Sequence, residues 1–384
     1  MMKTLPSYNE MLSQLIALPS ISCSDPRIDQ SNLLVVELLA DWLQRLDFDV
    51  EIMHLPGEEG KANLIASWGT GPGGLVLAGH SDTVPYDENL WDSDPFTLTE
   101  KNNRLYGLGA TDMKGFFPLA IEAIKHFKRE QLKEPLIFIA TANEETSMSG
   151  ARALVEQGRP KARYAVIGEP TGLRPIRMHK GITMEAIRIT GQSGHSSDPS
   201  LGNNAIEAMH SALTAIMSWR ESLSQRLQNA LFVIPFTTVN LGCIHGGDNP
   251  NRICGSCELQ IDIRPIPGMQ LDELRAELKK ILVPLAHKHK VKLEIEALFP
   301  GTPAFETAAD SHLVKMAEKL TGHTAEAVAF GTEAPFFQAL ETETIILGPG
   351  SIDQAHQPNE FIALDQIPKG ISQIRHFIQT LCMN

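Results

Sequence analysis

Cysteine is scarce in this sequence, which has five cysteines among 384 residues. A number so small and odd gives no disulfide framework and suits a reducing compartment. Cys254 and Cys257 form a C-x-x-C motif, but no second cysteine pair or nearby histidine accompanies them. We therefore interpret both as structural residues rather than as part of a zinc or redox motif.

Basic residues are also in the minority, with 33 Lys and Arg against 46 Asp and Glu and a formal net charge of -13. Nucleic-acid phosphates demand a basic surface, so we expect no nucleic-acid partner. No apolar run approaches the ~20 residues of a membrane-spanning helix, and the N-terminus lacks the basic-then-apolar layout of a signal peptide. The sequence therefore predicts a cytoplasmic protein without a membrane partner.

The chain length favours two domains, because 384 residues are too many for one ordinary core. Up to residue 179, strands and helices alternate in the manner of a mixed, largely parallel sheet flanked by helices. Residues 180–299 instead give half-buried strands in the order β-α-β-β-α-β, which is ferredoxin-like. The buried-strand pattern resumes in residues 300–384. We thus predict an α/β domain, residues 1–179 and 300–384, with an inserted α+β domain, residues 180–299.

A histidine and a carboxylate follow the apolar run at residues 75–79, with His80 directly after it and Asp82 two residues later. Ligands bind beyond the carboxyl ends of strands in open α/β sheets. Taken alone, His80 is better interpreted as a solvated loop residue. The pattern recurs, however, at Asp112, Glu144, Glu145, Glu169 and His356. These residues outnumber the three protein ligands of a single catalytic zinc and favour a site for two metals.

Six segments carry a family resemblance: G-H-S-D at 79–82, G-A-T-D-M-K-G at 109–115, A-N-E-E at 142–145, G-E-P-T at 168–171, G-H-S-S at 194–197, and G-P-G-S…A-H from 348 to 356. Together they resemble the two-zinc aminoacylase/deacetylase/carboxypeptidase family, in the family's order and over essentially the whole chain. The resemblance implies a zinc-peptidase-like catalytic domain, with the insert acting as a lid and dimerisation domain. It also implies a homodimer that holds two Zn²⁺ per chain, with Co²⁺ or Mn²⁺ as possible substitutes.

The same resemblance implies roles for the metal-site residues. His80 and Glu169 would bind one ion, Glu145 and His356 the other, and Asp112 would bridge them. Glu144 would be the general base, Asp82 would fix the His80 tautomer, and His195 would stabilise the oxyanion in a partner subunit's site. Without the resemblance, adjacent glutamates indicate a charged turn, and a histidine beside Ser and Gly indicates an ordinary surface residue.

Substrate contacts are implied at Asn251 and Arg264, because the guanidinium of arginine binds a carboxylate with two parallel hydrogen bonds. Gly331, Thr332 and Glu333 would form the opposite wall. Glu333 has two interpretations that the sequence leaves open. It could receive a cationic amine of the substrate, or it could stabilise a helix N-terminus.

Resemblance in H-K-G-I-T at 179–183 and F-G-T-E-A-P-F-F at 330–337 implies a substrate, N2-acetyl-L-ornithine, hydrolysed to L-ornithine and acetate in arginine biosynthesis. Within the family, N-succinyl-diaminopimelate or a dipeptide is the alternative substrate. A non-catalytic, ligand-binding relative is the alternative from another class, although neither Glu144 nor a metal ligand is missing. A two-metal phosphatase is disfavoured, because no basic phosphate cradle accompanies the ligands.

Overall fold

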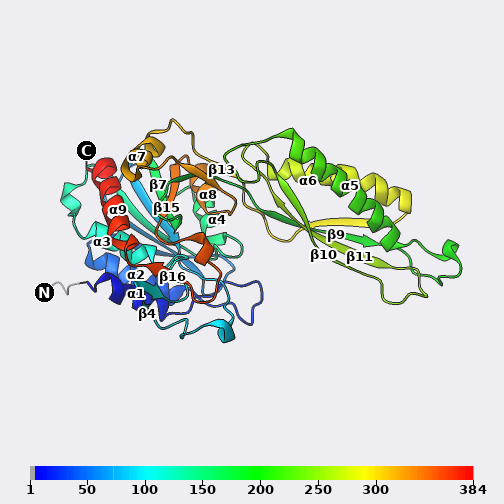
Figure 1. Cartoon of the computed structure of the whole chain (residues 1–384), viewed down its shortest axis with the longest axis horizontal. Coiled ribbons are helices and arrows are strands. Elements are labelled where there is room, and N and C mark those ends of the chain that lie inside the picture. The colour runs from blue at the N-terminus through cyan, green and yellow to red at the C-terminus, as the bar shows by residue number, and fades with distance from the viewer. Residues whose placement is uncertain (1–4, 72, 384) are drawn as a thin grey trace. The chain divides into compact units, whose positions relative to one another are not determined.

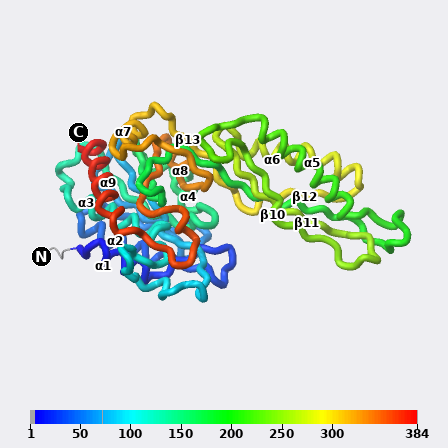
Figure 2. Tube along the Cα trace, viewed as in Figure 1, coloured from blue at the N-terminus to red at the C-terminus, as the bar shows by residue number. Residues whose placement is uncertain are grey.

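The computed structural model describes residues 5–71 and 73–383. The chain separates into two compact units. The first contains residues 1–177, 307–326 and 332–384, and the second contains residues 178–306 and 327–331. In Figure 1 the second unit is the part coloured green to yellow. Within the first unit, the orange and red trace after residue 307 lies among the blue and cyan trace of the first half (Figure 2).

The helices are α1 (Tyr8–Ile16), α2 (Leu33–Arg45), α3 (Phe116–Ile124), α4 (Ser149–Glu156), α5 (Ala205–Arg226), α6 (Leu271–His289), α7 (His312–Thr321), α8 (Ala334–Ala339) and α9 (Gln366–Cys382). Short 3-10 turns are η1 (Glu88–Leu90), η2 (Arg129–Gln131), η3 (Pro199–Leu201) and η4 (Ile352–Gln354). The strands are β1 (Asp49–His54), β2 (Ala62–Trp68), β3 (Leu75–His80), β4 (Thr99–Lys101), β5 (Arg104–Tyr106), β6 (Leu136–Thr141), β7 (Tyr164–Pro170), β8 (Ile176–His179), β9 (Thr183–Thr190), β10 (Thr238–Gly246), β11 (Ser256–Arg264), β12 (Lys292–Ala297), β13 (Phe305–Glu306), β14 (Glu326–Val328), β15 (Glu343–Gly348) and β16 (Phe361–Ala363).

The main sheet has the strand order β1-β2-β6-β3-β7-β15-β8-β13, and β14 pairs with β8. Its four central strands, β6, β3, β7 and β15, are parallel. Each is an apolar run that is buried along almost its whole length, as a parallel sheet covered on both faces requires. The carboxyl ends of these strands therefore meet at one edge.

Helices cover the sheet because alternate strand residues point to opposite faces. Side chains of α1, α2, α3, α7 and α9 share one core with Leu75, Leu77 and Val166. Helix α4 packs against α8 in a separate cluster. The chain passes from β3 to β6 on one side and then to β7 on the other, so right-handed crossovers place α3 and α4 on opposite faces. The end of β3 is therefore a topological switch point, where α/β sheets bind ligands.

The second unit has a four-stranded antiparallel sheet of order β10-β11-β9-β12. Helices α5 and α6 pack against it and share a core with alternate residues of β9 and β11. Cys254 and Cys257 are buried free thiols within this core, which agrees with a structural role. The element order of this unit is β-α-β-β-α-β.

The predicted fold class, a mixed α/β sheet flanked by helices, is confirmed. The sheet is parallel at its centre, whereas β1, β2 and β8 pair antiparallel on either side. A small third sheet, β16-β5-β4, was not predicted. Its β4 and β5 strands form a tight hairpin around Asn102 and Asn103, both of which have positive φ. Among the described residues, no helix combines the length and apolar character that crossing a membrane requires.

Candidate metal centre

The metal-binding side chains predicted from the sequence gather at the carboxyl edge of the parallel strands. His80 is the last residue of β3, and Glu169 is the penultimate residue of β7. Glu144 and Glu145 come in the turn after β6, and His356 comes in the loop after β15. His80 and Glu169 are almost fully buried, whereas the side chain of His356 is 53 % exposed. The site is thus deep on one side and open on the other.

Asp112 lies between the two histidines. Its Oδ1 is 3.0 Å from Nε2 of His80, and its Oδ2 is 3.4 Å from Nε2 of His356. Glu169 Oε1 is 3.8 Å from the same His80 nitrogen, and Glu145 Oε2 is 3.0 Å from the His356 nitrogen. Each histidine therefore has its own carboxylate, and Asp112 is shared.

The donor atoms fit divalent cations. Two sets, His80 with Glu144 and Glu169, and His80 with Asp112 and Glu145, each place their ligand atoms within 4.8 Å of one another. Imidazole nitrogen and carboxylate oxygen are donors that zinc, cobalt and manganese all accept. The first set includes Glu144, to which the family resemblance gave the role of base rather than ligand.

Burial and mutual repulsion dominate the electrostatics of the glutamates. Burial raises the pKa of Glu144 and Glu169 well above the ordinary value, and neighbouring carboxylates raise both further, although the charge of His80 opposes the shift. The pKa of Glu145 is raised mainly by burial and by the charge of Asp112. So many buried acids have few cationic side chains to balance them, and bound cations would supply the missing positive charge.

The shared aspartate and its histidines show the opposite balance. Burial acts to raise the pKa of Asp112, but hydrogen bonds with His356 and His80 outweigh it and lower that pKa. Hydrogen bonds to Asp112 and Glu145 raise the pKa of His356 to about 10. Burial acts to lower the pKa of His80, but its bonds to Asp112 and Asp82 raise it well above the ordinary value.

Asp82 contacts the site through both its backbone and its side chain. Its carbonyl oxygen is 3.0 Å from Nδ1 of His80, whereas its carboxylate oxygen is 3.6 Å away. When the ring is neutral, a proton on Nδ1 leaves the lone pair on Nε2, the nitrogen that a metal ion would bind. The carboxylate of Asp82 also accepts hydrogen bonds from the N–H groups of Glu144 and Glu145, at 3.3 and 3.2 Å. One residue thus orients a histidine and the turn that carries both glutamates.

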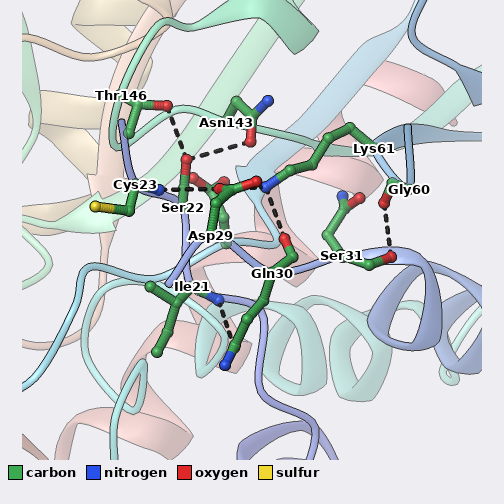
Figure 3. A network of polar contacts seen from close by, with 12 residues as sticks. Ile21, Ser22, Cys23, Asp29, Gln30, Ser31, Gly60, Lys61, Asn143 and Thr146 are labelled. Carbon is green, nitrogen blue, oxygen red and sulfur yellow. Dashed lines mark hydrogen bonds and ion pairs between the residues drawn. The ribbon is translucent and has the colours of Figure 1, made fainter. Parts of the chain in front are cut away.

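A polar network fixes the start of the same turn (Figure 3). Asn143 directly precedes the two glutamates and has a φ of +57°. Its Oδ1 accepts a hydrogen bond from the hydroxyl of Ser22 at 3.2 Å, and Ser22 also bonds Thr146 at 2.8 Å. The Asn143 amide nitrogen donates to Glu58. Nearby, Lys61 bonds Asp29 Oδ1 and the carbonyl of residue 30 (Figure 3).

Neither this network nor Glu360, a buried carboxylate that accepts hydrogen bonds from the Asp112 loop, was predicted from the sequence. No periodic pattern marks these residues, because their bonds join segments that are distant in sequence. The motif A-N-E-E, which includes Asn143, was the one available signal.

The predicted substrate residues of the first unit, Thr332 and Glu333, are both fully buried. Glu333 immediately precedes α8, but its side chain makes no capping hydrogen bond. Burial raises its pKa to about 7. Its negative charge in turn helps to raise the pKa values of Glu144 and Glu169. Glu333 is therefore a buried carboxyl group close enough to the ligand cluster to interact with it electrostatically. Gly331 belongs to the second unit.

The predicted residues of the second unit lie at opposite ends of its sheet. His195 is exposed, and its backbone forms an isolated β-bridge with Arg252. Arg252 follows Asn251 and comes four residues before the start of β11. Arg264 ends β11 and bonds Asp262 at 3.0 Å. At ~3.3 Å per residue, the length of β11 separates the two ends by about 26 Å. His195 and Arg264 of one chain therefore cannot contact the same small molecule.

Residues 76–380 match the model of peptidase family M20/M25/M40. The chain is 50% identical over 379 residues to a protein from Proteus mirabilis named acetylornithine deacetylase, covering 99% of this chain and 98% of that one. A protein with the same name from Pasteurella multocida is 48% identical over 99% of this chain and 100% of its own.

Solved structures share the fold at lower identity. The aminopeptidase PepT of Bacillus cereus superposes with a TM-score of 0.76 at 19% identity, covering 99% of this chain and 100% of that one. A dinuclear metal-binding peptidase of the M20 family from Bacillus subtilis gives a TM-score of 0.66 at 16% identity, covering 97% and 98%.

Proposed function

The chain belongs to peptidase family M20/M25/M40, and we propose that it is a metal-dependent amidohydrolase that cleaves N2-acetyl-L-ornithine into L-ornithine and acetate. The near-complete coverage of relatives named acetylornithine deacetylase supports this substrate. With this reaction, the enzyme would act in arginine biosynthesis. The five free cysteines support the proposed cytoplasmic location, because thiols stay reduced there.

The observation that carries the proposal is the placement of Asp112, with one oxygen toward His80 and the other toward His356. In this assignment His80 and Glu169 would hold one zinc ion, Glu145 and His356 would hold the other, and Asp112 would be shared between them. Bound there, the ions would supply Lewis-acid stabilisation of the negative charge that develops on the amide oxygen. Cobalt or manganese would fit the same donors.

Glu144 moves the proton in this proposal. It is buried, and its backbone N–H donates to Asp82, so the turn that carries its side chain is fixed next to the ligands. It takes a proton from the attacking water and delivers it to the departing amine nitrogen, so one residue serves both halves of the reaction. Asp82 keeps His80 in the tautomer that presents Nε2 to the site.

Substrate recognition is assigned to Arg264, with Gly331 and Thr332 as further contacts from the same chain and Asn251, which lies beside His195, as a contact from the partner chain. The guanidinium of Arg264 suits the α-carboxylate of an acylated amino acid. Glu333 is buried, so within this proposal it supports the ligand cluster and is the less suitable receptor for a cationic amine.

A homodimer completes the proposal. His195 and Arg264 lie at opposite ends of β11, so one site needs them from different chains. We therefore assign His195 to the oxyanion of the partner's site, and we assign the second unit as the lid and the dimer contact. Strands β10 and β12 are the free edges of its sheet, and edges of this kind pair readily with another chain.

The test is an assay of zinc-loaded protein with three amides: N2-acetyl-L-ornithine, N-succinyl-diaminopimelate and a dipeptide. Each is followed by release of the free amine. We expect kcat/KM to be highest for the acetyl substrate. A preference for the succinyl substrate or the dipeptide would replace the proposed substrate with that alternative. Tight binding without hydrolysis of any of the three would support a non-catalytic relative.

A further inference from the structure

Glu360 is a buried carboxylate that makes an unusual set of hydrogen bonds. It is 1% exposed and lies four residues after His356 in the same loop. Its Oε2 accepts from the N–H of Gly109 at 2.9 Å. Its Oε1 accepts from the N–H groups of Thr111 and Asp112, at 2.7 and 2.9 Å. Three backbone N–H groups within four residues of one loop therefore bond to a single side chain.

The same two segments are joined at other atoms. The carbonyl of Glu360 accepts from the N–H of Gly107 at 3.1 Å. The hydroxyl of Thr111 donates to the carbonyl of Phe361 at 2.5 Å, and Phe361 pairs with Tyr106 in the small sheet. Residues 107–112 are therefore hydrogen-bonded repeatedly to residues 360 and 361, which hold this loop in place.

From these contacts we infer that Glu360 is a positioning residue, which holds Asp112 so that its two oxygens face His80 and His356. The inference rests on the bridging role proposed for Asp112. The Asp112 N–H is bonded directly to Glu360, so the carboxylate fixes the backbone from which the shared ligand projects. Because His356 is on the same loop as Glu360, the contact also links the segments that carry His356 and Asp112, two of the three proposed ligands of the more exposed position.

A glutamate is needed here for a geometric reason. Three N–H donors converge on two oxygens, and only a carboxylate presents an acceptor at both positions. After Glu360→Gln, the amide oxygen can still accept from Thr111 and Asp112. The amide nitrogen would then face the N–H of Gly109, which loses its acceptor. Removing such a supporting contact typically weakens metal binding by about 10–100-fold.

The experiment compares Glu360→Gln with the wild-type chain in two measurements. The first is the dissociation constant and number of bound Zn²⁺ ions, from competition with a chelator. The second is hydrogen exchange at residues 107–113 in the metal-free protein. The matched control is Glu318→Gln, because the Glu318 carboxylate also accepts a backbone N–H, that of Ala325 at 3.0 Å, but on α7.

We expect Glu360→Gln to bind zinc about 10–100-fold more weakly and to lose exchange protection at residues 107–113, while Glu318→Gln changes neither. Wild-type zinc affinity together with wild-type protection would overturn the inference. If Glu360→Gln does not fold, Glu360→Asp tests the same carboxylate, because it keeps the charge but withdraws the oxygens by one methylene from the three N–H groups. A folded Glu360→Asp chain with unchanged affinity and protection would also overturn the inference.

Failure of the proposed function gives a different result. A wild-type chain that holds zinc but hydrolyses no amide would refute the substrate, while the zinc affinity of Glu360→Gln would still decide the role of Glu360. If the wild-type chain bound no zinc, unchanged exchange protection in Glu360→Gln would refute the role and lost protection would retain it.

Discussion

Oδ1 of Asp112 lies 3.0 Å from Nε2 of His80. The second oxygen of the same carboxylate is 3.4 Å from Nε2 of His356. The two histidines are thus linked through one short side chain, and each is also close to a glutamate of its own. Removal of Asp112 should therefore weaken both proposed metal positions, whereas removal of either histidine should weaken only one.

The first prediction concerns metal stoichiometry. His356→Ala removes a ligand of one position only, so we expect about one tightly held zinc ion per chain by elemental analysis, against two in the wild-type chain. Asp112→Ala removes the shared ligand, and both ions should be lost or weakly held. Two tightly bound ions in His356→Ala would remove that residue from the ligand set.

Glu144→Ala should separate catalysis from metal binding. We expect kcat to fall by roughly 10²–10⁴-fold, because the proton carrier is lost, while metal content and KM stay close to the wild-type values. The neighbouring Glu145→Ala is the matched control, and it should lose metal. Loss of metal from a folded Glu144→Ala chain would make Glu144 a ligand, as its place beside His80 and Glu169 allows.

Arg264→Ala should impair recognition of the carboxylate. We expect kcat/KM for N2-acetyl-L-ornithine to fall by an amount worth about 2–5 kcal/mol, because a desolvated charge pair is lost. An N-acetyl amine without the α-carboxylate should lose much less. Arg188→Ala is the control, since Arg188 pairs with Glu258 on the same sheet. Equal losses on both substrates would show that Arg264 acts through the structure.

The dimer is tested by complementation between two inactive variants. One subunit carries His195→Ala and the other carries Glu144→Ala, and the two are mixed under conditions that allow exchange. Half of the dimers should then be mixed, each with one site that has both residues, so about a quarter of wild-type activity should return. A fully active monomer in a sedimentation experiment would disprove the arrangement.

Stability should depend on pH through His179, which is buried beside Phe305 with Nδ1 2.8 Å from the carbonyl of Lys180. Burial lowers its pKa to about 4. Between pH 6.5 and about 4 the unfolded chain binds a proton that the folded chain does not. The free energy of unfolding that comes from neutral, buried His179 is therefore fully present above pH 6.5. It falls by about 3 kcal/mol as the pH decreases from 6.5 to 4.

Urea titrations across this range measure the effect. His179→Phe should flatten the acid limb of the stability curve relative to the wild-type chain, since the variant has no group to protonate there. His323→Phe, at an exposed position, should leave the limb unchanged. An identical acid limb in His179→Phe would assign the loss of stability to other groups.

Much of the ligand cluster was predictable because His80, Glu144, Glu145 and Glu169 lie at or just after the ends of apolar runs. Such runs identify buried parallel strands, and parallel strands end at a common edge, so His80 and Glu169 had to be neighbours. The same reasoning could not find Glu360 or Asn143. Their partners, Asp112 and Ser22, are far away in sequence, and a hydrogen bond between distant loops leaves no periodic trace.

Local geometry was harder to predict than position. The sequence predicted that Asp82 lies close to His80. It did not predict that the carbonyl oxygen of Asp82, and not its carboxylate, is the group closer to Nδ1 of His80. That choice depends on the turn after β6, whose N–H groups occupy the carboxylate. The β4–β5 hairpin was missed because its strands have three residues each, too few to show alternation.

The position of β15 between β7 and β8 has a consequence for how the protein is made. Ile345 pairs with Val166, although the whole second unit separates them in sequence. A ribosome must therefore synthesise that unit before it supplies the strand that closes the first one. Until then β7 keeps an open edge, and the nascent chain is exposed to misfolding and to chaperones. His356 emerges later still, so the metal centre is completed only after the sheet.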